Sequence, residues 1–99
     1  MAINCAGIVS GKAFVDLTRN DYERTIRVNV LGTINVTKAL LPGMLDSTLP
    51  CHIVNIASVL GSVGVSHMTD YCASKFAVVG FHQALTQEIS DSYSPCIFF

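Results

Sequence analysis

The sequence carries little charge, and the charge that it carries is balanced. Charged residues make up 13% of its 99 residues, with six Lys or Arg against seven Asp or Glu and a net charge of -1. We therefore expect no basic surface, which excludes the electrostatic attraction that nucleic acid or anionic lipid needs. A small neutral ligand suits this composition better.

The sequence also lacks the marks of membrane, secreted and metal-binding proteins. No apolar run approaches the roughly 18 residues of a membrane span, and no basic segment followed by an apolar one opens the chain. The four cysteines form no C-x-x-C pair and have no His at zinc-ligand spacing. We expect no membrane segment or targeting signal in this chain, no metal site, and reduced cysteines in an intracellular setting.

The order of apolar segments predicts an α/β fold. A hydrophobic fraction of 51% indicates a buried core. Short apolar segments at 3–7 and 52–57 are typical of strands, and they alternate with long amphipathic segments at about 18–46 and 70–90. A further strand begins after Pro95, at 96–99. This alternation favours a parallel sheet with helices on its faces.

Each predicted helix has a start signal and one distinctive stretch. Thr18 and Asp21 approximate a capping box, and Asn29 predicts a bend, or a backbone group diverted to a ligand, inside the long helix that follows. Thr69 offers an N-cap for the second helix. The small or apolar residues at 72, 76, 79, 80 and 84 predict its packed face. Between them, residues 59–67 are too irregular for a helix and suit a loop over a site.

Tyr71 and Lys75 are candidates for acid/base chemistry. At i and i+4 on a helix, both side chains leave the same face one turn apart. A phenol has a pKa of about 10, and a neighbouring ammonium lowers it by favouring the phenolate. About 0.1 such pair is expected by chance in this composition, so the pair alone is modest support. As the alternative, the two residues form a surface pair with a half-buried aromatic.

Ser58 strengthens the catalytic interpretation. It ends the predicted central strand thirteen residues before Tyr71, where its hydroxyl can contact the same substrate oxygen that Tyr71 protonates. Taken alone, Ser58 also fits a strand-end cap and Asn29 a helix bend. Gly7 and Gly11 fit turn geometry as well as contact with a cofactor.

Four stretches together resemble the short-chain dehydrogenase/reductase family. They are Asn4-Cys5-Ala6-Gly7, Val28-Asn29-Val30, Asn55-Ile56-Ala57-Ser58, and Asp70-Tyr71-Cys72-Ala73-Ser74-Lys75 followed by Phe76-Ala77 and Gly80-Phe81. Their order and spacing fit the family, and the one departure is Cys5, where the usual motif has its second Asn. The resemblance implies a partial Rossmann-type, doubly wound parallel sheet, with its central strands and helices only.

The resemblance also implies a role for each matched residue. Tyr71 would be the general acid/base, Lys75 its activator, Ser58 the group that polarises the carbonyl, and Asn29 the holder of a proton-relay water. The implied cofactor is NAD or NADP, with cofactor contacts expected at Asn4, Ala6, Gly7, Tyr71 and Lys75. Hydride would move between this cofactor and an alcohol or carbonyl.

Within the family, residues 51–54 and 70–82 are most similar to the retinol dehydrogenase branch. That similarity implies a small apolar alcohol or carbonyl substrate, and a location in the cytoplasm or at the endoplasmic reticulum membrane. Family members pair helices of this type between subunits, so the resemblance leaves open a homo-oligomer of the full-length form. Phe76, Val79 and Phe81 fit either the core of the domain or contact with a partner subunit.

The resemblance corresponds to the middle of a family domain. The family's Gly-rich turn, which supports the dinucleotide pyrophosphate, has no counterpart in these residues. We therefore expect residues 1–99 to be the central catalytic part of a single NAD(P)-binding domain, truncated at both ends. The alternative is a truncated, non-enzymatic product that is inactive alone or only pairs with a full-length partner.

Overall fold

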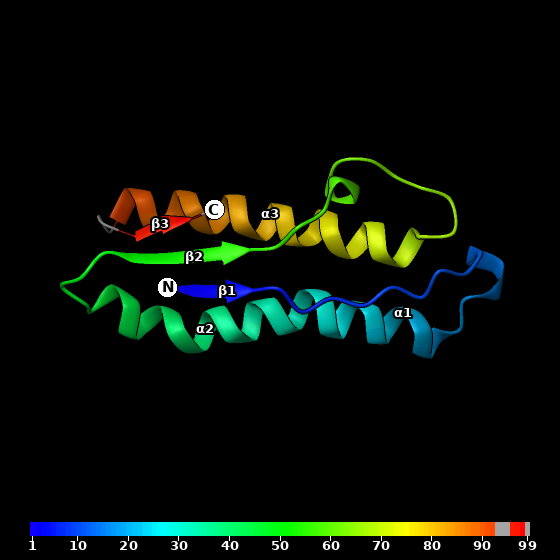
Figure 1. Ribbon diagram of the computed structural model, residues 1–99, viewed down its shortest axis with the longest axis horizontal. Coiled ribbons are helices and arrows are strands. Elements are labelled where there is room, and N and C mark those ends of the chain that lie inside the picture. Colours follow the sequence, from blue (N-terminus) through cyan, green and yellow to red (C-terminus); the bar gives the residue numbers. More distant parts are fainter. Residues whose placement is uncertain (93–95, 99) are drawn as a thin grey trace.

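The computed structural model describes residues 1–92 and 96–98. In chain order its main elements are β1 (Ala2–Asn4), α1 (Arg19–Ile26), the π-helical turn η2 (Arg27–Leu31), α2 (Gly32–Leu45), β2 (Cys51–Asn55), α3 (Thr69–Ser92) and β3 (Cys96–Phe98) (Figure 1). Two short 3-10 turns, η1 (Phe14–Asp16) and η3 (Val59–Gly61), lie in the connections after β1 and β2. The predicted α/β fold class is confirmed.

The sheet is parallel throughout, in the order β1-β2-β3. Asn4 of β1 pairs with Asn55 of β2, and Cys51 of β2 pairs with Cys96 of β3. Each connection between neighbouring strands contains a helix, as parallel pairing requires. The strand predicted after Pro95 is confirmed at Cys96–Phe98, whereas Pro95 and Phe99 themselves lie outside the described residues.

Both helices lie on the same face of this sheet. The Asn4 amide donates to Thr37 Oγ1 of α2 and to Asn55 Oδ1, and the Asn55 amide contacts His82 of α3. Two right-handed crossovers that step in the same direction place their helices in this way. On the opposite face Ile3 is 54% exposed, so the described residues cover only one side of the sheet.

The first helix is continuous from α1 through η2 to α2, as predicted. The capping box is confirmed, because the Thr18 hydroxyl accepts from the Asp21 N–H and the Asp21 carboxylate accepts from the Thr18 N–H. A hydrogen bond from the Lys12 ammonium, and to a smaller extent one from the Thr18 N–H, lowers the pKa of the Asp21 carboxyl to about 2. The disturbance predicted at Asn29 takes the form of the π-helical turn, in which the Gly32 N–H reaches back to the Arg27 carbonyl.

Three details of the region from 59 to 92 differ from the sequence prediction. Residues 59–61 form the 3-10 turn η3 instead of an irregular loop. Thr69 is the first residue of α3 and not its cap. The buried residues of α3 are Asp70, Cys72, Ser74, Lys75, Val78 and Ile89, while Phe76 is 48% exposed. Of the predicted face, Cys72 is buried and Val79 is partly buried, whereas Phe76, Gly80 and Ala84 are exposed. The prediction followed hydropathy, but the first turns of α3 bury polar side chains that hydrogen-bond to neighbouring segments.

Candidate active site

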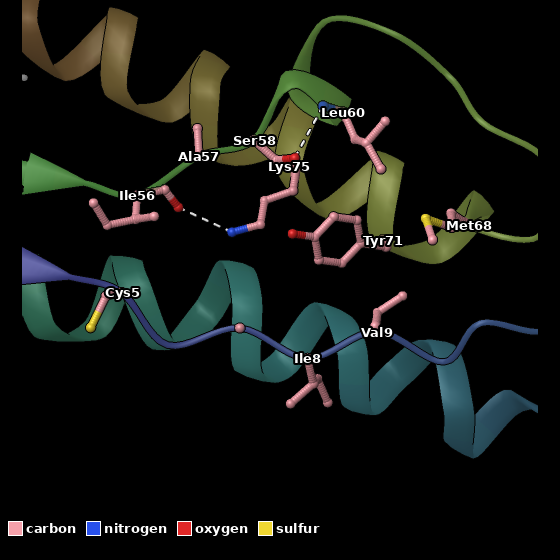
Figure 2. A pocket seen from close by; sticks show the side chains of 11 residues that line it. Cys5, Ile8, Val9, Ile56, Ala57, Ser58, Leu60, Met68, Tyr71 and Lys75 are labelled. Carbon is pink, nitrogen blue, oxygen red and sulfur yellow. Dashed lines mark hydrogen bonds between the residues drawn. The ribbon is translucent and has the colours of Figure 1, made fainter.

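A cavity of about 450 Å³ lies beyond the carboxyl ends of β1 and β2. Figure 2 shows that its walls come from the segment after β1, the segment after β2, and the first turns of α3. Its lining residues are Cys5, Gly7, Ile8, Val9, Ile56, Ala57, Ser58, Leu60, Met68, Tyr71 and Lys75. The carboxyl ends of parallel strands are the usual place for a ligand in an open α/β sheet.

Tyr71 and Lys75 meet in this cavity. The Lys75 side chain is buried, with 5% of the residue exposed, and its Nζ lies 5.5 Å from the centre of the Tyr71 ring. The ammonium donates to the Ile56 carbonyl at 3.0 Å, just beyond the end of β2. In Figure 2 the Tyr71 hydroxyl and the ammonium point toward one another in the space between the two strand ends.

Ser58 joins them from the segment after β2. Its backbone is extended, and its Oγ accepts a hydrogen bond from the Leu60 N–H at 3.2 Å, which starts the turn η3. The sequence left open a capping role and a catalytic role, and the structure shows the cap. Because a hydroxyl both donates and accepts, the Ser58 proton remains available to a ligand in the cavity.

Asn29 lies behind the cavity wall and holds it in place. Only 1% of this residue is exposed, in the middle of η2. Its Oδ1 accepts from the Ile8 N–H at 2.8 Å, and its Nδ2 donates to the Ile8 carbonyl and to Ser74 Oγ, both at 2.9 Å. These contacts fix the segment after β1 against α3. The role of Asn29 in holding a water stays a prediction.

The three residues expected to contact a cofactor from the end of β1 occupy different positions. Gly7 lines the cavity, and a Cβ added there would lie 3.6 Å from Lys75 Nζ. Asn4 does not line it, because its amide is bound to Thr37 and Asn55. Ala6 does not line it either. The cofactor contacts of all three stay predictions, and the side chain of Asn4 has a structural role between strand and helix.

Ser74 is a supporting residue to which the sequence analysis gave no role. It is fully buried, accepts from Asn29, and donates from Oγ to the Tyr71 carbonyl at 2.7 Å. Ser74 follows Tyr71 by three residues and therefore lies on the same face of the helix, and this spacing is the sequence feature that could have identified its role.

Neither a metal centre nor a membrane helix is present in the part of the chain that the structure describes. No group of three or more His, Cys, Asp or Glu side chains is placed to hold a metal ion there. None of its helices combines the length and the apolar character that crossing a membrane requires.

The sequence matches the short chain dehydrogenase family over residues 1–93. It is 42% identical over 89 residues to 17-beta-hydroxysteroid dehydrogenase 13 of Homo sapiens, a match that covers 90% of this chain and 29% of that protein. It is 44% identical over 92 residues to retinol dehydrogenase 10-A of Xenopus laevis, covering 93% of this chain and 27% of that protein. The chain thus spans between 27% and 29% of the length of these two relatives.

Solved structures agree with the fold. A short chain dehydrogenase/reductase from Burkholderia phymatum in complex with NAD superposes with a TM-score of 0.91 and 32% identity, covering 97% of this chain and 35% of that chain. A 4-hydroxyisoleucine dehydrogenase complexed with NADH gives a TM-score of 0.84 and 28% identity, covering 90% of this chain and 39% of that one. The family resemblance and the Rossmann-type fold are confirmed.

Proposed function

Because the chain belongs to the short-chain dehydrogenase family, we propose that it carries the reaction centre of an oxidoreductase that acts on an alcohol or its carbonyl. The observation that carries this proposal is the cavity at the strand ends, where Tyr71, Lys75 and Ser58 lie together. Residues 1–99 would be the central catalytic part of a single NAD(P)-binding domain, because they cover less than a third of each of the two relatives described above.

In the direction of reduction, the Tyr71 hydroxyl donates its proton to the carbonyl oxygen of the substrate. The adjacent Lys75 ammonium favours the phenolate that remains, because opposite charges attract strongly in a partly buried site. The Ser58 hydroxyl donates a hydrogen bond to the same substrate oxygen and stabilises the charge that develops on it. Oxidation runs through the same groups in reverse, with Tyr71 accepting the proton of the alcohol.

The residues around the cavity fit the nicotinamide end of NAD or NADP. Gly7 presents bare backbone beside Lys75, so a flat or bulky group can approach closely. An ammonium has three donors, and the Ile56 carbonyl takes one of those of Lys75, which leaves donors for ribose hydroxyls. When bound, the dinucleotide would supply hydride to the carbonyl carbon or accept it from the alcohol.

The substrate side of the cavity favours an apolar molecule. Val9, Leu60 and Met68 contribute apolar lining near Tyr71, whereas the Ile8 side chain points away from Tyr71 (Figure 2). Two relatives carry the names of retinol and of a hydroxysteroid, which are both largely apolar. We therefore propose a retinol-like or similar apolar alcohol as the substrate. The location in the cell and a homo-oligomeric full-length form stay predictions.

The test is a reductase and dehydrogenase assay of the protein that carries these residues, expressed at full length. Retinol with NAD or NADP, and retinal with the reduced forms, are followed by the absorbance of reduced nicotinamide. Tyr71→Phe should abolish turnover, while Tyr22→Phe, an exposed tyrosine on α1 outside the cavity, should leave it unchanged. Wild-type turnover in Tyr71→Phe would refute the proposed mechanism.

A second candidate is a chain that only pairs with a partner, and one observation favours it. Large apolar side chains remain exposed on the uncovered sheet face and along the helices, among them Ile3, Leu31, Val36, Leu40 and Phe76. Exposed apolar surface on this scale is typical of an interaction face. Light scattering and a dehydrogenase assay of the purified 99-residue chain together test this candidate. A pure oligomer without dehydrogenase activity supports it, and a monomer with dehydrogenase activity contradicts it.

A further inference from the structure

We propose that Asp70 is a positioning residue for Tyr71, and that its carboxylate fixes the start of α3 against the segment that lines the cavity. This inference rests on the proposed function. Asp70 directly precedes Tyr71 in the sequence, and 5% of it is exposed.

The carboxylate of Asp70 is held by two hydroxyl groups. Its Oδ2 accepts from Thr25 Oγ1 at 2.6 Å and from Ser10 Oγ at 2.7 Å. Hydrogen bonds of this length from a hydroxyl to a carboxylate are charge-assisted and stronger than neutral ones. The other oxygen, Oδ1, is buried and has no hydrogen-bond partner among the described residues.

The two hydroxyl groups come from different parts of the chain. Thr25 is fully buried on α1, one helical turn before Asn29. Ser10 belongs to the segment after β1, directly beyond Gly7, Ile8 and Val9, which line the cavity. Asp70 therefore ties α1, the cavity wall and the first turn of α3 to one point.

Asp70 is charged at neutral pH. Burial works to raise the pKa of its carboxyl, but the hydroxyls of Thr25 and Ser10, together with backbone N–H groups at the start of α3, outweigh burial and hold the pKa below its usual value. A negative charge at the first turn of a 24-residue helix is also favoured by the helix dipole. Because a carboxylate only accepts, both hydroxyls must donate to it, which fixes their orientation.

The segment after β1 is thus held at two positions, one before and one after Val9. Asn29 binds the backbone of Ile8, and Asp70 binds Ser10. Figure 2 shows Val9 opposite Tyr71 and Met68 across the cavity. Without the Asp70 carboxylate, the wall keeps its bonds to Asn29 and the longer contact of Ser10 Oγ with Thr25 Oγ1 at 3.4 Å, while the start of α3 loses its hydrogen bonds to Thr25 and Ser10. Tyr71 would then shift relative to the bound substrate.

The experiment compares variants of the full-length protein that carries these residues. Asp70→Asn removes the charge, Thr25→Val removes one hydroxyl at similar shape, and Thr25→Ser restores it. The matched control is Asp91→Asn, the same change at an exposed position of the same helix. The readouts are kcat, KM for the dinucleotide and for retinol, and hydrogen–deuterium exchange of the amides of residues 68–75.

We expect Asp70→Asn and Thr25→Val to lower kcat about tenfold or more while KM for the dinucleotide changes less than about twofold. Amide exchange over 68–75 should accelerate in both variants, and Thr25→Ser and Asp91→Asn should behave like the wild type. If Asp70→Asn fails to fold, the two Thr25 variants decide alone.

Two outcomes separate this inference from the proposed function. An unchanged kcat in Thr25→Val and in any folded Asp70→Asn, with Tyr71→Phe inactive, would overturn the positioning role and leave the function standing. A Tyr71→Phe variant as active as the wild type would overturn the function, and faster exchange over 68–75 in Thr25→Val would still report on the attachment of α3.

Discussion

Replacing Gly61 by alanine tests how closely the turn after β2 packs on the helix that carries the site. A Cβ at this position would lie 2.9 Å from Val79 Cγ2 and 3.1 Å from the backbone oxygen of Lys75. Carbon atoms pack best at about 3.5–4.0 Å. Val79 is β-branched, so its side chain has few alternatives in a helix, and the Lys75 carbonyl belongs to the helix backbone. The substitution must therefore push η3 and α3 apart.

The expected cost follows from this overlap. Overpacking of a buried contact destabilises a protein by about 1–3 kcal/mol. Gly64→Ala is the matched control, because a Cβ there has no atom within 4 Å. Adding Val79→Ala removes the shorter contact and leaves the one to Lys75. In a double-mutant cycle, Gly61→Ala made in the Val79→Ala background should lower the free energy of unfolding by about half as much as Gly61→Ala made in the wild type.

Urea unfolding of the full-length protein measures these free energies, and kcat reports whether Lys75 has moved with the helix. We expect Gly61→Ala to lower both the free energy of unfolding and kcat. If its free energy of unfolding falls within about 0.5 kcal/mol of the Gly64→Ala value, the close packing of η3 on α3 is refuted, and the reasoning from the added Cβ with it.

Three further predictions use the same unfolding assay. Burial lowers the pKa of His82, so the folded state binds a proton at this residue less readily than the unfolded chain does. The free energy of unfolding should therefore fall as the pH drops below about 6.5 and level off below the folded-state pKa. In His82→Gln this pH dependence should be absent. Asn29→Asp should lower the free energy of unfolding by about 1–3 kcal/mol or more, because it sets a carboxylate oxygen against the Ile8 carbonyl; a loss under about 0.5 kcal/mol would contradict the role of Asn29 in fixing the Ile8 backbone. Thr18→Ala should cost about 1 kcal/mol, since it removes the acceptor of the Asp21 N–H, and an unchanged stability would show that the cap is not formed.

Local signals in the sequence predicted the parts of the fold that depend on neighbours along the chain. Thr18 and Asp21 lie three residues apart, and their capping box needs no distant partner. The disturbance at Asn29 was also predictable from its poor helix propensity. Its π-helical form was not, because the surrounding turn is fixed by contacts of Asn29 with Ile8 and Ser74 from other parts of the chain.

The same division holds for the site. Helical spacing predicts that Tyr71 and Lys75 share a face, and the end of a strand predicts where Ser58 lies. The bond from Lys75 to the Ile56 carbonyl requires the packing of α3 on the sheet, which no local pattern records. Hydropathy misplaced part of the buried face of α3 for a physical reason. In its first turns Asp70, Ser74 and Lys75 are buried although they are polar, because they hydrogen-bond to the first helix and to the segments after β1 and β2.

The π-helical turn has a consequence for the alignment of four buried residues. Thr25, Asn29, Thr33 and Thr37 follow one another at every fourth position. In an ideal α-helix each step of four overshoots a full turn by about 40°, so the four would wind about 120° around the axis. The wider turn at Arg27–Leu31 takes up part of this drift and brings the row closer to a straight line.

The continuous helix formed by α1, η2 and α2 can therefore use one row of residues to contact two different parts of the fold. Its early part presents Thr25 to the start of α3, and its late part presents Thr37 to the first strand. Removing one residue from this turn would turn it into an ordinary α-helical turn and leave the part that follows nearly in place, because the extra residue is what the wider turn accommodates. Removing one residue between Gly32 and Thr37 would instead rotate Thr37 by about 100° and carry it away from the sheet.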